Sequence, residues 1–284
     1  MNVNMWQHSA TVANLDMLRQ RGHVIVEPGS GYLACGMTGP GRLAEPEMIV
    51  AAIARAGVKR RDLEGETVLI TAGPTQEPLD PVRYITNRSS GKMGYALADA
   101  AASRGARVIL ISGPVHLTPP LGVEVVPVQT ALEMREQVFA HLGDAEIVIK
   151  SAAVADSHLS KVPSQKVKKT AARISLELDP TPDILAELGR KKGDRLLIGF
   201  AAETQNLEQE ARRKLASKNC DMVVANIVGG NETGFESDQN EVVLVMATGE
   251  SISLPRASKR EIADRIFDEI LKLRLALNVS HDGH

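Results

Sequence analysis

From Val68 onward, short apolar runs alternate with segments whose apolar residues recur at helical spacing. Runs such as RVILIS (residues 107–112) and EIVIKSAA (residues 146–153) are apolar along most of their length, which is typical of parallel strands covered on both faces. Strands that alternate with helices in this way predict an α/β fold with a doubly wound, mostly parallel Rossmann-like sheet. In such a sheet, ligands bind beyond the carboxyl ends of the strands.

The predicted elements follow one another at short intervals. Strands are predicted at residues 68–72, 107–112, 123–128, 146–151, 174–178, 196–201 and 222–225, and helices at residues 91–103, 131–142, 182–191 and 207–218. Two further apolar runs, at residues 241–246 and 251–254, flank the turn ATGE and predict a C-terminal β-hairpin. The amphipathic pattern of residues 259–273 predicts a helix that closes the domain.

We expect four parts along the chain. They are a separate N-terminal piece at residues 1–46, a helix and basic linker at residues 47–66, the α/β domain at residues 67–275, and a polar, disordered tail at residues 276–284.

The N-terminal piece differs in pattern from the α/β domain. We predict a helix over residues 9–21, a short strand at HVIVEP (residues 23–28) and a Gly-rich loop over residues 29–43. A lone strand and helix cannot bury a core of their own. This piece must therefore pack on something else or be poorly ordered.

Composition excludes several classes of protein. A net charge of −2 and an aromatic content of 3% disfavour nucleic-acid and membrane-surface partners. No apolar run approaches the roughly 18 residues that span a bilayer, and the start MNVNMWQHSA lacks the features of a signal peptide. The two cysteines form no CxxC pair and indicate a reducing compartment. We expect a cytoplasmic protein.

A loop and a helix N-terminus follow the first strand of the α/β domain and form an anion site. Such a site arises because backbone N–H groups and the helix dipole converge at the start of a helix. Ser89 and Ser90 are predicted to cap this helix, and Gly105 to end it. The same loop carries Arg83 and Asn87.

Three more polar clusters follow other strands. Residues 151–169 begin with small residues, carry Asp156 as an acceptor or metal contact, and continue into a Lys-rich segment that we predict to be a lid. DPTPDIL (residues 179–185) places a proline at the first helical position and Asp183 in the first turn. Lys214 and Lys218 lie one helical turn apart, suited to two points on a polyphosphate. Each cluster alone is typical of ordinary surface, but all four fall at one edge of the sheet.

Two familiar types of site are disfavoured. The GxGxxG pattern of dinucleotide-binding proteins is incomplete, since Gly91 and Gly94 lack the earlier glycine. The second strand ends in Gly113 and Pro114, with no carboxylate to hold a ribose. The seven histidines show no HExxH or similar spacing, which argues against a zinc site held by the protein.

Six segments closely resemble the phosphopantothenate–cysteine ligase family of bacterial coenzyme A biosynthesis. They are ITAGPTQEPLDPVRYITNRSSGKMG, SAAVAD, KVKK, PDIL, GFAAET and ANIVGGNETGFESDQNEV, and the resemblance covers about residues 65–273. Residues 1–46 resemble the C-terminal piece of the phosphopantothenoylcysteine decarboxylase that bacteria often fuse ahead of the ligase, through MNVNMW and GYLACGMTGPGR.

The resemblance implies a ligation in two steps. CTP activates the carboxylate of 4′-phosphopantothenate as an acyl-cytidylate and pyrophosphate leaves. The amine of L-cysteine then attacks, which gives 4′-phosphopantothenoylcysteine and CMP. The family also implies Mg²⁺ as cofactor and a homodimer, and whether this chain prefers CTP or ATP stays open.

The resemblance also assigns roles to residues. Asn87 would contact the acyl-phosphate intermediate with Arg83 beside it, and Lys166 on the lid would act on the intermediate. The nucleotide pocket would be formed by Ser151, Ala152, Asp156, Lys166, Pro182, Asp183, Ile184, Leu185, Phe200, Lys214 and Lys218. The phosphate cradle would be formed by Ser89, Ser90, Gly91, Lys92 and Gly94.

Two positions depart from the family pattern. Pro74 replaces a frequent glycine, which stiffens the turn and removes one N–H donor. Lys150 stands where a small residue is more usual and adds charge near the pocket.

The decarboxylase half is represented by Asn2 and Cys35, which map onto its substrate-contacting Asn and the Cys of its flap. The flavin-binding core and catalytic His of that family lie upstream of Met1, so we expect FMN and decarboxylation only where that core is present. Two other functions stay open, namely a non-catalytic nucleotide-binding regulatory subunit and, more weakly, an NAD(P)-dependent reductase.

Overall fold

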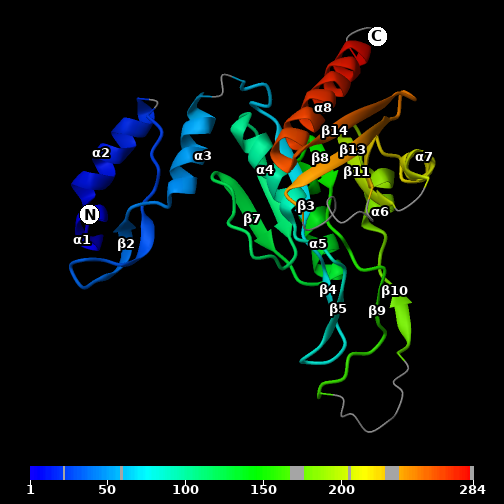
Figure 1. The fold of residues 1–284 in the computed structure, drawn as a ribbon, viewed down its shortest axis with the longest axis horizontal. Coiled ribbons are helices and arrows are strands. Elements are labelled where there is room, and N and C mark those ends of the chain that lie inside the picture. The colour runs from blue at the N-terminus through cyan, green and yellow to red at the C-terminus, as the bar shows by residue number, and fades with distance from the viewer. Residues whose placement is uncertain (22, 58–59, 167–175, 204–205, 228–236, 282–284) are drawn as a thin grey trace. The chain divides into compact units, whose positions relative to one another are not determined.

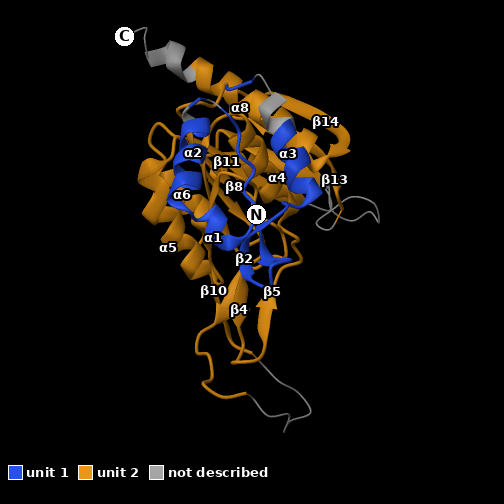
Figure 2. Ribbon diagram, turned by 90° about the vertical axis from the view of Figure 1, so that its left-hand side faces the viewer, with its two compact units in different colours: residues 1–61 blue, residues 62–284 orange. Residues whose placement is uncertain are grey.

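The computed structural model describes residues 1–21, 23–57, 60–166, 176–203, 206–227 and 237–281. The chain forms two compact units, residues 1–61 and residues 62–284, coloured separately in Figure 2. We call them unit 1 and unit 2 and describe each by itself.

Unit 2 is built on an eight-stranded sheet (Figure 1). In spatial order its strands are β14 (Ser251–Ser258), β13 (Gln239–Met246), β12 (Met222–Ile227), β11 (Leu196–Glu203), β8 (Ile147–Lys150), β3 (Thr67–Ala72), β6 (Arg107–Ser112) and β7 (Val123–Pro127). The six strands from β12 to β7 are parallel, whereas β13 and β14 pair in antiparallel fashion at one edge. The predicted doubly wound sheet with a C-terminal hairpin is confirmed.

Strand order reverses at β3, which pairs with β6 on one side and β8 on the other. The crevice beyond the carboxyl ends of β3 and β8 is therefore the switch point, where doubly wound sheets bind ligands.

Helices cover both faces of this sheet. Helices α4 (Lys92–Ser103) and α8 (Lys259–His281) pack on one face, and α5 (Ala131–His141), α6 (Ile184–Lys191) and α7 (Leu207–Ser217) pack on the other. A short 3₁₀ helix, η1 (Leu142–Asp144), follows α5. Each face has its own apolar cluster, which explains why the central strands are apolar almost throughout.

Arg104 links the end of α4 to α8 through hydrogen bonds. It is the C-cap residue of α4, and its side chain is 2% exposed. The guanidinium donates to both carboxylate oxygens of Asp62 at 2.8 Å, to the carboxylate of Asp268 at 2.9 Å and to the carbonyl oxygen of Asp264 at 2.9 Å. Gly105 follows with a φ of +94°, so the predicted glycine end of α4 is confirmed.

Helix α8 is longer than predicted. It continues to His281 rather than ending at Leu273, so residues 276–281 are helical and not a disordered tail. No glycine or proline interrupts the stretch from Lys259 to His281, and apolar residues keep recurring in it. The polar composition of the last residues therefore gave the wrong end point.

Two small hairpins were not predicted. β4 (Gln76–Pro78) pairs with β5 (Tyr84–Thr86), and β9 (Ser157–Leu159) pairs with β10 (Leu178–Pro180). Each strand has only three residues, too few to show an alternating pattern. The strand predicted at residues 174–178 was misplaced, because β10 begins at Leu178, and residues 174 and 175 lie outside the described part of the chain.

Unit 1 holds α1 (Val3–Trp6), α2 (Ser9–Gln20), the hairpin of β1 (Gly29–Tyr32) with β2 (Thr38–Arg42), and α3 (Pro46–Gly57). The predicted helix over residues 9–21 is confirmed, but HVIVEP is no strand and the expected Gly-rich loop contains the hairpin. Cross-strand pairing with Thr38–Arg42 makes the Gly-rich segment a strand, whereas HVIVEP finds no such partner among the described residues. The four-part division of the chain stays a prediction.

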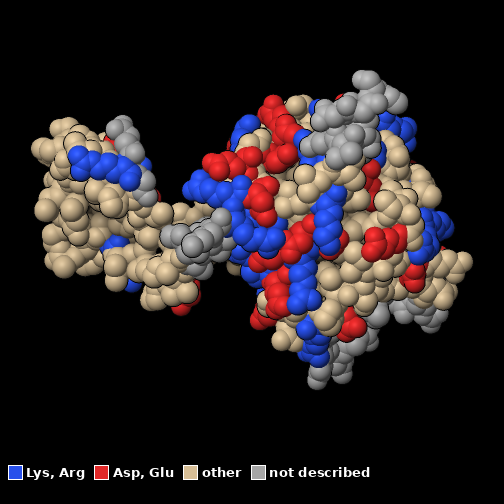
Figure 3. Space-filling view, turned by 90° about the horizontal axis from the view of Figure 1, so that it is seen from above, with Lys and Arg blue, Asp and Glu red and all other residues tan. Residues whose placement is uncertain are grey.

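Charged side chains of both signs are intermixed on the face of unit 2 shown in Figure 3. This distribution matches the small net charge of −2. Within the described residues, no helix is long and apolar enough to cross a membrane.

Candidate active site

The loops that leave β3 and β8 are paired beyond the sheet. The N–H of Ala153 donates to the carbonyl oxygen of Gly73 at 2.9 Å, and the N–H of Ala155 donates to the hydroxyl of Thr75 at 2.9 Å. Pro74 and Ala153 form a parallel bridge. These bonds extend the parallel pairing of the two strands into the loops, so the polar residues that follow each strand are held at fixed positions.

The anion cradle lies at the start of α4. Gly91 is its N-cap residue, with a φ of +75°, a conformation that favours glycine. A Cβ atom on Gly94 would lie 2.5 Å from the Cβ of Ala72 and 2.9 Å from the hydroxyl of Ser151. The helix can approach β3 this closely only because residue 94 is glycine.

The predicted capping residues Ser89 and Ser90 precede the N-cap position, which Gly91 occupies. Ser89 accepts a hydrogen bond from the Gly91 N–H at 3.4 Å. The left-handed conformation of Gly91 sets the helix start, which a serine-based interpretation could not foresee.

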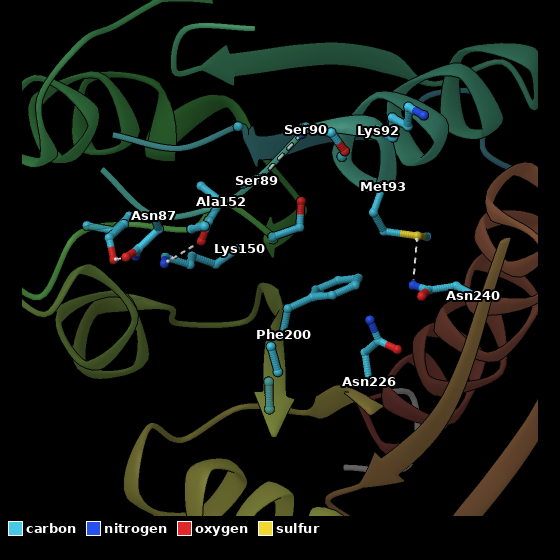
Figure 4. A pocket seen from close by; sticks show the side chains of 18 of the residues that line it. Asn87, Ser89, Ser90, Lys92, Met93, Lys150, Ala152, Phe200, Asn226 and Asn240 are labelled. Atoms are coloured by element: carbon cyan, nitrogen blue, oxygen red, sulfur yellow. Dashed lines mark hydrogen bonds between the residues drawn. The ribbon is translucent and has the colours of Figure 1, made fainter. Parts of the chain in front are cut away.

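A cavity of about 340 Å³ lies between the cradle and the ends of β8, β11 and β12 (Figure 4). We call it the first cavity. The predicted site residues that line it are Asn87, Ser89, Ser90, Gly91, Lys92, Gly94, Ser151, Ala152, Asp156, Phe200 and Lys214. The structure thus brings together residues that the sequence separates by more than a hundred positions.

A second cavity of about 230 Å³ adjoins the first. The predicted residues that line it are Asp156, Pro182, Asp183, Ile184, Leu185, Phe200, Lys214 and Lys218. The two cavities share Lys150, Val154, Asp156, Phe200 and Lys214, so they form one continuous site with two ends.

The second cavity is dominated by charge. Lys218 and Asp183 form an ion pair at 2.6 Å, and the ammonium of Lys214 donates to the carbonyl oxygen of Phe200 at 2.8 Å. Partial burial alone would raise the pKa of Asp183, but the bonds from Lys218 and from the Ala186 N–H hold it below its usual value.

The start of α6 differs from the prediction. Asp183 is the N-cap residue and accepts from the Ala186 N–H at 2.9 Å, so Pro182 precedes the helix rather than occupying its first position. A capping carboxylate sets the start here, because it satisfies an N–H group that the helix leaves unpaired.

Of the three predicted catalytic residues, one lines the first cavity and two line neither cavity. Asn87 lines the first cavity, and its Nδ2 donates to the carbonyl oxygen of Val154 at 2.9 Å, which joins the two loops. Arg83 lies outside the lining of both cavities and forms a 2.6 Å ion pair with the buried Asp80. Lys166 is exposed and lines neither cavity. Residues 167–175 of the predicted lid lie outside the described residues.

Two asparagines of the first cavity were missed. Asn240 is 3% exposed, its Nδ2 lies 3.9 Å from the sulfur of Met93, and its Oδ1 has no hydrogen-bond partner. The Oδ1 of Asn226 is likewise buried and unpaired. Both side chains lie beside Phe200 and Met93 in Figure 4. Buried carboxamide oxygens without a partner are costly, so these two are ready to accept from a ligand.

Two lysines were also missed as site residues. Lys150 and Lys259 both line the first cavity. Burial, together with the nearby Lys214, lowers the pKa of Lys150 to about 8. Burial and the nearby Lys92 likewise lower the pKa of Lys259 to about 8. Lys150 ends the apolar strand β8, and Lys259 begins helix α8 directly after β14. These positions were the sequence signal that could have identified them as site residues.

A magnesium ion fits the second cavity only with help from a ligand. The described residues contain no cluster of three or more His, Cys, Asp or Glu side chains that could hold a metal. Asp156 and Asp183 both line this cavity. Mg²⁺ is commonly held by one or two carboxylates together with substrate phosphates, and this donor set suits that arrangement.

Asn2 and Cys35 lie in unit 1. The Oδ1 of Asn2 caps α1 by accepting from the Met5 N–H at 2.8 Å, and Cys35 is an exposed free thiol. Unit 1 buries few apolar side chains and leaves Met5 and Tyr32 more than half exposed.

Comparison with family models and known proteins agrees with this architecture. Residues 63–273 match the family described as DNA/pantothenate metabolism flavoprotein C-terminal domain, and residues 1–57 match the family described as Flavoprotein. The coenzyme A biosynthesis bifunctional protein CoaBC of Bacillus subtilis (strain 168) is 51% identical over 276 residues, which cover 96% of this chain and 68% of that protein.

Solved structures give the same result. The crystal structure of the C-terminal domain of CoaBC is 45% identical with a TM-score of 0.66, and the match covers 75% of this chain and 98% of that chain. A Cab2 mutant in complex with phosphopantothenate-cysteine is 20% identical with a TM-score of 0.63, covering 85% and 97% respectively, and supports the fold alone.

The cradle at the switch point, the family match over most of unit 2 and the 51% identity with a curated relative lead to one conclusion. This chain belongs to the CoaBC family of bifunctional enzymes of coenzyme A biosynthesis.

Proposed function

We propose that unit 2 is a phosphopantothenate–cysteine ligase. It would activate 4′-phosphopantothenate with CTP, form an acyl-cytidylate and pyrophosphate, and transfer the acyl group to the amine of L-cysteine. The products would be 4′-phosphopantothenoylcysteine and CMP.

The observation that carries this proposal is the continuity of the two cavities. The first ends at a helix N-terminus, which suits the phosphate of 4′-phosphopantothenate. The second carries Lys214 and Lys218, which suit a triphosphate. A ligand in each cavity would bring the carboxylate and the α-phosphate together where Asp156, Phe200 and Lys214 are shared.

The chemistry needs stabilised charge more than a nucleophilic side chain. Forming the mixed anhydride builds negative charge on the α-phosphate and on the leaving pyrophosphate, which fixed cations and Mg²⁺ would stabilise. Asn87, placed between the two loops, is our candidate for contact with the acyl phosphate. We keep Arg83 and Lys166 as candidates, although neither lines the cavities as described.

A nucleotide-resolved assay tests the function. Pyrophosphate release by the purified chain should require CTP or ATP, 4′-phosphopantothenate and Mg²⁺ together, and CMP or AMP formation would identify the nucleotide. Lys166→Ala should stall after activation, and Asn87→Asp should impair handling of the intermediate. The control is Lys272→Met, a lysine of α8 with a 70% exposed side chain. Absence of turnover with every nucleotide would refute the ligase.

Binding measurements on the same purified chain distinguish two other functions from the ligase. A regulatory subunit would bind CTP in calorimetry without turning it over. An NAD(P)-dependent reductase would bind a nicotinamide cofactor, and Gly113 and Pro114, which follow β6, supply no carboxylate to hold its ribose. FMN and decarboxylation are proposed only for a protein in which unit 1 is joined by a flavin-binding core. Sedimentation would test the expected homodimer.

A further inference from the structure

Lys150 occupies the junction of the two cavities. It is the last residue of β8, opposite Thr71 of β3 and Gly199 of β11, at the carboxyl edge of the sheet. Lys150 lines both cavities, and in Figure 4 a dashed line joins its ammonium group to Ala152.

The ammonium group of Lys150 has little to balance its charge. Its one hydrogen bond runs to the carbonyl oxygen of Ala152 at 3.0 Å, and it forms no ion pair with any described residue. The charged groups that act on it are Lys214 of α7, Asp183 at the start of α6, and Asp156 after β8. Asp183 is already paired with Lys218.

A partly buried cation in this position is costly unless a further anion reaches it. Burial and Lys214 together lower the pKa of Lys150 to about 8, which reflects this cost. Lys150 lines both cavities, so a ligand bound there could accept from its remaining N–H groups. The missing anion is therefore expected from a ligand.

We propose that Lys150 is a further phosphate-binding residue, whose ammonium group binds the nucleotide α-phosphate at the junction of the two cavities. This inference rests on the proposed ligase function. Lys218 lines only the second cavity, and Lys214 lines both; these two lysines would contact the outer phosphates. Lys150 would thus act at the phosphorus atom that is attacked, and Lys214 and Lys218 on the pyrophosphate that leaves.

A change of protonation should accompany binding. Near pH 8 about half of the Lys150 side chains are neutral in the free protein. A bound phosphate favours the charged form and raises the pKa again. Nucleotide binding should therefore take up about half a proton at this pH, and much less at about pH 6.5, where Lys150 is already charged.

Calorimetric titration of the full chain with CTP and MgCl₂, in two buffers of different ionisation enthalpy, counts these protons. Lys150→Met should weaken CTP binding by about tenfold to a hundredfold and remove the uptake. Lys150→Arg should keep most of the affinity but also lose the uptake, because arginine stays charged. The titration of the CTP γ-phosphate is common to all variants and cancels in the comparison. Lys272→Met should match the wild type.

The outcomes are distinct. If the wild type binds CTP, and Lys150→Met binds equally well with the same proton uptake, the role of Lys150 is refuted while the ligase proposal stands. If the wild type binds neither CTP nor ATP, the role of Lys150 and the ligase proposal are both refuted. Thermal unfolding of each variant shows whether a weak titration reflects loss of the fold, and Lys150→Arg then decides the question, because it retains the charge.

Discussion

Both cavities contain lysines and carboxylates, but they differ in what else lines them: the first has the glycines at the start of α4 and three asparagines, whereas the second has the Lys218–Asp183 ion pair. The first is shaped by Gly91 and Gly94, which let α4 begin against β3, and by Asn226 and Asn240. The second depends on Lys214, Lys218 and two carboxylates.

This difference predicts different sensitivities. Backbone donors keep their position and charge at any pH, so the part of the first cavity at the start of α4 should respond mainly to changes of shape. Ionic contacts respond to salt and to protonation, so the second end should respond mainly to changes of charge. Lys150 belongs to both ends.

The largest effect is expected from Gly94→Val. The new Cβ would meet Ala72 at 2.5 Å, and since backbone and strand must move, the cradle should be lost. We expect turnover to fall by about a hundredfold or more and the free energy of unfolding to fall by about 1–3 kcal/mol. Pyrophosphate release measures the turnover, and urea unfolding measures the free energy of unfolding. Gly143→Val is the control, since nothing lies within 4 Å of its Cβ. Equal behaviour of the two variants would contradict the close approach of α4 to β3.

The next effect tests the charged end. Lys214→Met should weaken nucleotide binding by about tenfold to a hundredfold, and binding of 4′-phosphopantothenate by less, since Lys214 lines both cavities. The residual nucleotide binding should depend less on salt, because one ionic contact is gone. Arg213→Met is matched on the same helix, with a side chain that is 77% exposed. Equal losses of affinity for both ligands would show that the two ends are not separate.

Asn240→Leu separates stability from binding at the first end. Removing a buried oxygen without a partner should raise the free energy of unfolding of the ligand-free protein by about 1 kcal/mol. The same change should weaken binding of 4′-phosphopantothenate. Urea unfolding with and without that ligand measures both effects. A destabilised variant with normal affinity would mean that Asn240 has a structural partner rather than a ligand.

The smallest effect is a pH dependence of stability. Lys150 and Lys259 have pKa values of about 8 in the folded protein, below the ordinary 10.5 of the unfolded chain. Above pH 8 the unfolded chain therefore binds more protons, and the free energy of unfolding should rise with pH. Between about pH 8 and 9 each lysine contributes less than about 1.4 kcal/mol.

Urea unfolding of Lys150→Met and Lys259→Met should each show about half of this rise. Above about pH 9 the buried thiol of Cys220 opposes it, because burial raises its pKa to about 12 and the unfolded chain then binds fewer protons. A rise that is unchanged in both variants would place its origin elsewhere in the protein.

Much of the fold could be predicted because its signals are local. The apolar strands at the centre of the sheet, such as residues 107–112, are buried on both faces and show this in their composition. The hairpins β4–β5, β9–β10 and β1–β2 could not be predicted, since their strands are short or rich in glycine and depend on pairing with another segment.

The site shows the same limit. Asn87 and the cradle glycines lie in one loop whose sequence is distinctive, and the structure places them together. Asn226 and Asn240 lie near the two ends of the segment ANIVGGNETGFESDQNEV, for which no site role was predicted from the sequence, and the pairing of β12 with β13 brings both to the cavity. Arg83 and Lys166 were proposed from resemblance, and their roles stay predictions.

Helix α4 is held at both of its ends, and this limits what the site can accept. At its start, Gly94 lies against Ala72 of β3, and at its end Arg104 bonds to Asp62, Asp264 and Asp268. A helix fixed in this way cannot tilt to follow a smaller ligand. With the phosphate bound at the helix start as proposed, a pantothenate analogue without its phosphate would leave that place unfilled, and we expect the fixed helix to discriminate against it.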